Sequence, residues 1–318
     1  MKIRTTPCPI FLFIIIFVLL LCKPAISQNE DATWWNEVHN WDGVTHWSDY
    51  IIYSPYYLGP NALSVPFSQK GQVKDRYGLQ VNIENHFYSG DKTQNLFVSL
   101  YLPVVKNFVA FEFYGVPIEH YKMDEKTVVE RRSRIRSGEG YAVGDFYFST
   151  IIQLWKKPDI AFRMAGRTAS GSKLNEARYT DAPGYFFDLS FGKDLLVHEK
   201  FVDKIRLHGM IGFYVWQMNL PDSRQNDAIL FGLGFDLFMK SFILSNSIDG
   251  YSGYFGNEEV VVANKDQPVV FKDRPAVYRL DITKESGKID YIIGYQIGIH
   301  DFEYQSIKLS LLFHFDKK

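Results

Sequence analysis

Residues 145–168 read DFYFSTIIQLWKKPDIAFRMAGRT, and this stretch decides the fold class. Apolar and polar side chains alternate on both sides of the hinge KKPD at residues 156–159. Because side chains of a β-strand point alternately to opposite faces, the alternation predicts a hairpin with one apolar and one polar face. Phe146 and Phe148 belong to the apolar face, whereas Tyr147 and Ser149 belong to the polar face. The apolar face must be covered by a protein core or by lipid.

The beginning of the chain predicts export. Lys2 and Arg4 precede an apolar run at residues 10–21, and small residues follow at 25–27 with the spacing of a signal-peptidase site. We therefore expect a signal peptide at residues 1–27, cleaved near Ser27. The apolar run is shorter than the ~20 residues that a membrane-spanning helix needs.

Composition excludes several classes of site and partner. Both cysteines, Cys8 and Cys22, lie in the signal peptide, so the mature chain offers no disulfide, thiol nucleophile or cysteine-bound metal. Lipidation of Cys22 is disfavoured because the preceding Leu21 is large. With 35 basic and 36 acidic residues, the net charge of -1 gives no attraction for nucleic acid. The aromatic share of 16% fits a large all-β core or the aromatic girdles of a membrane barrel.

Strand-like alternation recurs twelve times from Val73 onward. The runs are centred near Val81, Val98, Phe111, Phe148, Phe162, Leu189, Ile211, Phe231, Ile243, Leu280, Ile293 and Leu311. Bacterial single-chain barrels have an even number of strands, with both chain ends on the periplasmic side.

The connections between these runs are sorted by length. Short connections follow even-numbered runs, at residues 104–107, 155–159, 238–241 and 284–288, and long ones follow odd-numbered runs, at 116–142, 169–184, 217–226 and 250–274. Three connections depart from the rule: SGDKT and HDFE are short, and KDLLVHEKFVDK is long. A soluble sandwich has no reason to sort its loops in this way. We therefore predict an all-β, antiparallel up-and-down transmembrane β-barrel of about twelve strands at residues 73–318, in the bacterial outer membrane.

The last run, SIKLSLLFHFDKK, forms an apolar ladder that ends on Phe313 and Phe315, with Lys308 and Ser310 on the other face. It resembles the C-terminal strand of bacterial outer-membrane proteins, although residues 316–318 follow where such proteins usually end on Phe. This resemblance implies that Phe313 and Phe315 are read by the barrel-assembly machinery and that lipid surrounds the strand.

A family resemblance rests on residues 138–172, GEGYAVGDFYFSTIIQLWKKPDIAFRMAGRTASGS. This stretch resembles the Gly-Asp-strand-turn-Pro-strand signature of an outer-membrane barrel family described as the MetA pathway of phenol degradation. The match lies at Gly140, Gly144, Asp145, Pro158, Arg163, Thr168 and Gly171. The stretch SPYYLGPNALSVP at residues 54–66 is similar to barrels of the Bacteroidetes type. The resemblance implies an outer-membrane barrel that transports small aromatic compounds.

Residues 28–72 precede the barrel and hold four of the six tryptophans: Trp34, Trp35, Trp41 and Trp47. We expect Asp31 to cap a helix that Gly43 ends, with Trp34 and Trp41 on one face, and residues 54–66 to be a loop. The segment is interpreted as a plug of the lumen or a periplasmic, interfacial anchor. The alternative is an aromatic platform for a sugar or ring compound.

The alternation also places charges of both signs inside the barrel. They are Glu84, Glu112, Asp145, Asp188, Asp236, Asp281, Asp290, Arg163, Arg167, Arg206, Arg279 and Lys308. Tyr147 is expected opposite Arg167, with Asp145 diagonal to it, which permits a cation-π contact and an ion pair. Ion pairs that fill the barrel are one interpretation. The other is a polar path for a solute along Asp145, Tyr147, Arg163, Arg167, Arg206, Arg279 and Asp281.

The second outer loop, the long connection at residues 116–142, contains ERRSRIR, with Arg131, Arg132, Arg134 and Arg136. Guanidinium groups bind phosphate through two hydrogen bonds, so this loop is a candidate for contact with lipopolysaccharide phosphates or an anionic solute. A plain solvated loop is the alternative.

Together these features predict a channel or transporter for a small solute, aromatic or anionic. The alternatives are a non-conducting structural or adhesion barrel and an outer-membrane hydrolase. For the hydrolase, the candidates are His300, Asp301, Glu303 and His120, but neighbours on an extended chain point to opposite faces, so His300 and Asp301 should not pair. The sequence has neither Gly-x-Ser-x-Gly nor H-E-x-x-H. We therefore predict no catalytic residue, metal or cofactor.

Overall fold

The computed structural model describes residues 32–196, 201–217, 226–253 and 274–315. The predicted signal peptide with Cys8, Cys22 and the cleavage site at Ser27, the helix cap Asp31 and the tail at 316–318 lie outside these residues.

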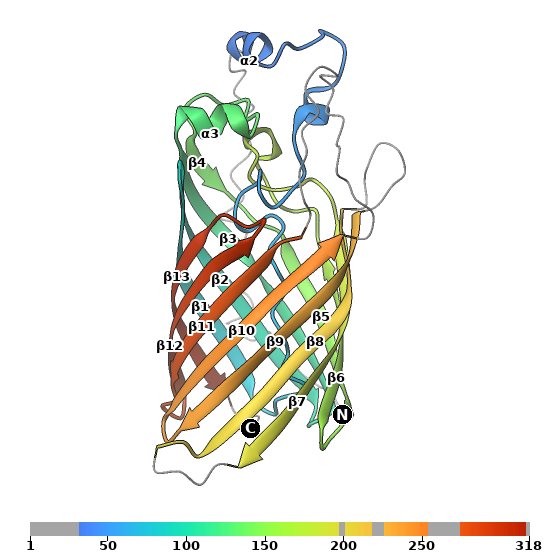
Figure 1. Ribbon diagram of the computed structural model, residues 1–318, viewed down its shortest axis with the longest axis vertical. Coiled ribbons are helices and arrows are strands. Elements are labelled where there is room, and N and C mark those ends of the chain that lie inside the picture. The colour runs from blue at the N-terminus through green and yellow to red at the C-terminus, as the bar shows by residue number, and fades with distance from the viewer. Residues whose placement is uncertain (1–31, 197–200, 218–225, 254–273, 316–318) are drawn as a thin grey trace, which may run out of the picture.

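The described chain forms a closed antiparallel β-barrel (Figure 1). Its strands are β1 (Tyr77–Tyr88), β2 (Asp91–Val105), β3 (Val109–Met123), β4 (Glu139–Ala142), β5 (Phe146–Trp155), β6 (Asp159–Arg167), β7 (Gly184–Leu196), β8 (Lys204–Gln217), β9 (Asn226–Met239), β10 (Phe242–Gly253), β11 (Ala276–Lys284), β12 (Ile289–His300) and β13 (Gln305–Phe315). Apart from β4, each strand pairs with its neighbours around the wall in sequence order, and β13 pairs with β1, Phe315 opposite Tyr77, to close the ring.

The short strand β4 shares one position in the wall with β5. Both pair with β3, β4 along Glu119–Lys122 and β5 along Val109–Gly115, so the wall is twelve strands around. The twelve-stranded barrel predicted from the sequence is confirmed, and each of the twelve predicted centres lies in a different strand.

The hairpin of β5 and β6 has the two faces that its alternation predicts. The side chain of Phe148 points outward and is 55% exposed, whereas Ser149 points inward and is 3% exposed. Exposed apolar side chains recur around the whole wall, including Ile83, Phe113, Met164, Leu189, Ile211, Leu233, Ile293 and Leu309. No described strand or helix covers this outward face, which is the arrangement of a barrel that stands in lipid.

The two ends of the barrel differ. Short turns at residues 106–108, 156–158, 240–241 and 285–288 connect strands at one end, called here the turn end, where β1 begins and β13 ends. The opposite end, called the loop end, carries the long connections. One prediction there is wrong: residues 116–142 are not all loop, because β3 continues to Met123 along the full length of β2, and β4 then pairs with it. Helix α3 (Glu125–Glu130) lies between them.

The tryptophan-rich region lies at the loop end (Figure 1). It contains helix α2 (Thr33–Val38) and the 3-10 turn η1 (Trp47–Tyr50). The helix is shorter than predicted because Asn40 adopts a left-handed conformation, φ +49°, which ends it before Trp41. No helix in the described part of the chain is long and apolar enough to cross a membrane.

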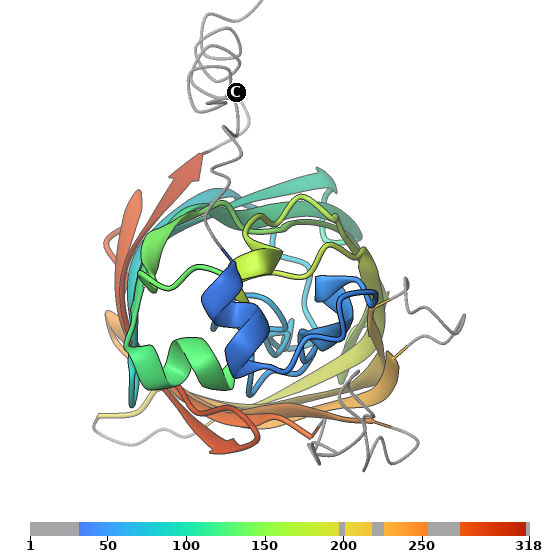
Figure 2. The same cartoon turned by 90° about the horizontal axis from the view of Figure 1, so that it is seen from above.

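Residues 54–74, called here the lumen segment, run through the barrel interior from the loop end toward β1 (Figure 2). As predicted for residues 54–66, the segment has no helix or strand, since Pro55, Pro60 and Pro66 interrupt both. Its backbone must therefore find hydrogen-bond partners on the barrel wall.

Candidate functional site in the barrel lumen

Four arginines of the wall hold the backbone of the lumen segment. Their guanidinium groups donate to carbonyl oxygens, Arg167 to Ala62 at 2.6 Å, Arg279 to Val65 at 2.6 Å, Arg163 to Phe67 at 2.7 Å and Arg206 to Lys70 at 2.8 Å. They come from strands β6, β8 and β11, so the segment is fastened to opposite parts of the wall. The arginines are buried, and an unpartnered buried guanidinium would cost several kcal/mol.

Each of these arginines also faces a carboxylate of the wall. The ion pairs are Arg163 with Asp188 at 2.7 Å, Arg167 with Asp145 at 3.9 Å, Arg206 with Asp159 at 2.8 Å and Arg279 with Asp249 at 2.8 Å. Each guanidinium thus lies between a carboxylate and a carbonyl oxygen. The wall neutralises its own arginines, and the lumen segment supplies further acceptors beside those of the barrel, such as Gln296 for Arg279 and the Ala182 carbonyl for Arg167.

Side chains of the lumen segment make the complementary contacts, because they donate to wall carboxylates. Asn61 donates to Glu119 at 2.8 Å, Gln69 to Glu112 at 3.2 Å, Lys70 to Asp236 at 2.7 Å and Gln72 to Asp159 at 2.7 Å. Nearer the turn end, the amide of Gln153 donates to the Gly71 carbonyl at 2.8 Å and accepts from the Val73 N–H at 2.8 Å. The segment is therefore bound by polar contacts along its length.

The predicted lumen residues do lie inside the barrel. Asp145, Tyr147, Arg163, Arg167, Arg206 and Arg279 are buried, and Asp281 pairs with Lys308 at 2.9 Å. The register predicted from the KKPD hinge is confirmed, with Tyr147 opposite Arg167. The ring of Tyr147 stacks on that of Tyr114, with ring centroids 4.7 Å apart. Asp145, from the family-like stretch, accepts a hydrogen bond from the Gly171 N–H at 2.7 Å.

A buried ionic network closes the loop end of the lumen. Asp91 at the start of β2 accepts from Arg131 at 2.7 Å, Arg178 at 2.6 Å and the Tyr304 hydroxyl at 2.5 Å. Arg178 also binds Glu119 at 2.7 Å. Burial opposes the charge of Arg178, but the two carboxylates outweigh it and keep the pKa of Arg178 above its ordinary value.

Sequence reasoning missed Arg178 and its partners. Arg178 lies in an irregular loop between β6 and β7, where no period of two predicts which way a side chain points. Its link to Asp91, 87 positions earlier in the chain, leaves no local signal in the sequence.

The predicted tryptophan and arginine sites contact each other. Arg134 lies over the rings of Trp35 and Trp47, at 5.6 and 5.4 Å, and Arg136 over Trp34 at 5.9 Å. The indole N–H of Trp35 donates to the carbonyl oxygen of another loop arginine, Arg132, at 2.9 Å. Residues 32–53 pack on the second loop, and we call them the Trp cap.

The arginines of the second loop contact groups of the same chain. Arg131 is buried on Asp91, Arg134 and Arg136 lie over tryptophan rings, and Arg132 donates to the carbonyl oxygen of Tyr50 at 3.2 Å. Helix α2, which contains Trp34 and Trp35, lies above the barrel at the loop end, while Trp41 is exposed and donates to the Thr45 carbonyl at 2.8 Å. Inside the barrel lies the residue 54–74 stretch, which carries no tryptophan.

His300 and Asp301 form a pair, contrary to prediction, with His300 Nδ1 3.1 Å from Asp301 Oδ2. The prediction is wrong because β12 ends at His300 and Asp301 turns into a left-handed conformation, φ +46°. Both groups also bind the backbone of Arg274, whose carbonyl oxygen lies 3.0 Å from His300 Nδ1 and whose N–H donates to Asp301 at 3.2 Å. The pair thus fastens a loop. His120 pairs separately with Glu139 at 3.4 Å.

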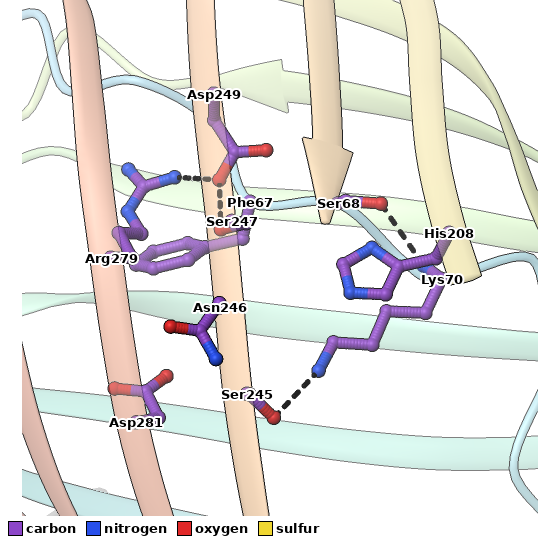
Figure 3. Close-up of a pocket in the computed structure, with 10 residues that line it drawn as sticks. All are labelled: Phe67, Ser68, Lys70, His208, Ser245, Asn246, Ser247, Asp249, Arg279 and Asp281. Atoms are coloured by element: carbon purple, nitrogen blue, oxygen red, sulfur yellow. Dashed lines mark hydrogen bonds and ion pairs between the residues drawn. The ribbon is translucent and has the colours of Figure 1, made fainter. Parts of the chain in front are cut away.

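A cavity of about 50 Å³ remains between the lumen segment and strands β8, β10 and β11 (Figure 3). Phe67 and Lys70 of the segment line it, together with wall residues that include His208, Asp249 and Arg279. The cavity can hold water molecules but not a sugar or an aromatic ring. The aromatics at the end of β13, Phe313 and Phe315, lie apart from it, opposite Leu79 and Tyr77 at the turn end.

Comparison with known proteins places the fold. No protein-family model matches the sequence, and no curated protein matches it. Among solved structures, the COG4313 outer membrane channel from Pseudomonas putida F1 has a TM-score of 0.54 at 10% identity, covering 79% of this chain and 100% of that chain.

Two further solved structures have lower scores. LpxR from Salmonella typhimurium has a TM-score of 0.46 at 7% identity, covering 75% of this chain and 100% of its own. The KdgM porin has a TM-score of 0.39 at 7% identity, covering 74% and 99%. The chain has the twelve-stranded β-barrel fold of bacterial outer-membrane proteins.

Proposed function

We propose that the protein is an outer-membrane channel for a small solute and that the lumen segment closes it. The observation that carries this proposal is the way the segment is held. It contributes no strand to the wall, and β1 and β13 close the ring without it. Its polar contacts are hydrogen bonds and ion pairs that water or a solute could replace, while Leu58, Leu63 and Val65 pack in a buried apolar cluster with aromatic side chains of the barrel.

The same geometry supports an orientation. Short turns lie on the periplasmic side of bacterial outer-membrane barrels and long loops on the outer side. The loop end with its Trp cap then faces outward, where lipopolysaccharide surrounds the barrel. Phe313 and Phe315 lie at the periplasmic end, where the assembly machinery would read them.

The solute is a narrower proposal. The family-like stretch at residues 138–172 supports kinship with the MetA-pathway barrels, and hence a small aromatic compound as one solute. Capture of an anion by the second loop loses support, because its arginines already bind Trp rings and carboxylates.

Single-channel recording in a planar bilayer tests the channel proposal. The protein beginning at residue 28 should be silent or open rarely, and a variant lacking residues 28–72 should conduct steadily. Faster migration of the unheated sample on a detergent gel would show that the variant is folded. A folded variant that stays silent would refute the channel and favour the non-conducting structural barrel.

A point variant with the whole chain present gives an independent reading. Arg279→Gln removes the donor to Val65 and should raise the frequency of openings. Lys204→Gln is the matched control, since Lys204 also loses one positive charge but pairs with Asp194 at the rim of the barrel. Equal traces for the two variants would contradict release of the segment as the opening step.

A further inference from the structure

We infer that the open lumen selects cations over anions, and that Asp236 and Glu112 carry this selectivity. The inference rests on the proposed function and names the class of solute that it passes. It comes from how the wall charges are paired when the lumen segment is in place.

The basic side chains of the wall are neutralised by the wall itself. Arg163, Arg167, Arg206 and Arg279 each face a wall carboxylate, as described above. Lys308 lies 2.9 Å from Asp281. These five pairs stay in the barrel when the lumen segment leaves, so they add little net charge to an open pore.

Two carboxylates of the wall are bound instead by side chains of the lumen segment. Asp236 binds the ammonium of Lys70, and Glu112 binds the amide of Gln69, and both partners belong to the lumen segment. The wall offers Glu112 the hydroxyls of Ser99 and Ser149, each at 3.5 Å, and the nearby charge of Arg163, which is already paired with Asp188.

The basic wall side chains closest to Asp236, Glu84 and Asp290 are histidines, which are charged only when protonated. His208 lies 3.5 Å from Asp236, His86 lies 3.7 Å from Glu84, and His314 lies 2.6 Å from Asp290. Withdrawal of the segment removes Lys70 and leaves a net negative lumen. A narrow pore with walls of low dielectric focuses this field and concentrates cations.

Lys70 shows what such a site accepts. Its ammonium lies 2.7 Å from Asp236 and 3.2 Å from the Ser245 hydroxyl, beside the cavity of about 50 Å³ (Figure 3). In the closed state the lysine occupies, as a tethered cation, the position that a free monovalent cation or alkylammonium group would take.

The reversal potential of the variant lacking residues 28–72, measured across a KCl gradient, tests the inference. Potassium should be more permeant than chloride. Asp236→Asn and Glu112→Gln in that variant should each lower the permeability ratio, whereas Glu139→Gln, an exposed carboxylate on β4, should leave it unchanged. A ratio at or below one would overturn the inference while leaving the channel intact. A folded but silent variant would overturn the channel and the inference together.

A second measurement keeps the whole chain. Lys70→Ala removes the tethered cation, and ethylammonium chloride should then raise the unfolding temperature more than it does for the unchanged protein. The double variant Lys70→Ala with Asp236→Asn should lose this added effect. An equal response of all three proteins would overturn the cation site.

Discussion

Phe148 and Arg163 lie on opposite faces of one hairpin, with Phe148 exposed on the outside of the barrel and Arg163 buried in the lumen against Asp188. Period-two alternation placed Phe148 outside and Arg163 inside, because the backbone geometry of a strand fixes this choice locally. The partner of Arg163 includes the carbonyl of Phe67, 96 positions earlier. The lumen segment has no regular period, so nothing in the sequence indicates which of its carbonyls meets which arginine.

The outward direction of Phe148 leads to a stability prediction. Phe148→Arg should reduce the free energy of unfolding from lipid by about 2–4 kcal/mol if the residue lies near the bilayer midplane. Phe148→Leu, which remains apolar, is the control and should cost less than ~1.5 kcal/mol. Urea titration of the protein in liposomes would measure both. Equal stabilities for the two variants would mean that position 148 does not contact lipid.

The contacts of Arg279 lead to a second prediction at this scale. Its replacement by Gln leaves Asp249 without its buried partner and takes a donor from Val65. Breaking such a pair costs roughly 3–5 kcal/mol, whereas the exposed pair of Lys204 and Asp194 contributes ~0–1 kcal/mol. In the same titration, the free energies of unfolding of Arg279→Gln and Lys204→Gln should therefore differ by several kcal/mol. A difference near zero would show that Arg279 does not hold the lumen segment.

Among the elements, strands were predicted better than loops. Each of the twelve strand centres was found, since alternation over ten or so residues is a strong local signal. The extension of β3 to Met123 was missed because Glu119 and Lys122 break the apolar pattern, although Glu119 points inward to the network around Arg178. The contact between the Trp cap and the arginines of the second loop was not predicted, because the two come from separate segments of the chain.

The orientation of the elements can be tested on cells. Val44 in the Trp cap is 89% exposed, and Phe108 in the turn between β2 and β3 lies at the other end. With the loop end outside, a membrane-impermeant maleimide should label Val44→Cys on intact cells but label Phe108→Cys only after lysis. Labelling of position 108 alone on intact cells would invert the orientation.

The Trp cap should also respond to acid. Burial, followed by the charge of Arg132, lowers the pKa of His39 from 6.5 to about 4, and the His39 ring packs on Trp35. A depressed folded-state pKa means that the neutral ring stabilises the cap above pH ~6.5 and that this stabilisation is lost as the pH falls toward 4. Tryptophan fluorescence should therefore shift on acidification between these values, and His39→Gln should weaken the shift. An unchanged profile in the variant would assign the response to other groups.

For the whole molecule, the class of fold was predictable and the closure of the lumen was not. Strand parity and loop lengths are global regularities that the sequence shows directly. Closure depends on residues 54–74 packing inside a ring whose side chains come from far along the chain, such as Arg279, 214 positions after its partner Val65. The sequence indicated a plug within 28–72 but centred it on the tryptophans, since large aromatic side chains are the stronger local signal.

One labelling experiment tests the central claim, that a barrel standing in lipid is closed by its own lumen segment. Residues 28–318 contain no cysteine, so a single thiol introduced into a protein that begins at residue 28 reports alone. A probe at Phe148→Cys should be quenched by lipid-soluble agents with or without residues 28–72.

Ser149→Cys, one position along, should resist a water-soluble maleimide in the folded protein and react once residues 28–72 are removed. Reaction of position 149 in the folded protein with the segment present would contradict closure, and a probe at 148 that membrane-phase quenchers cannot reach would contradict the barrel itself.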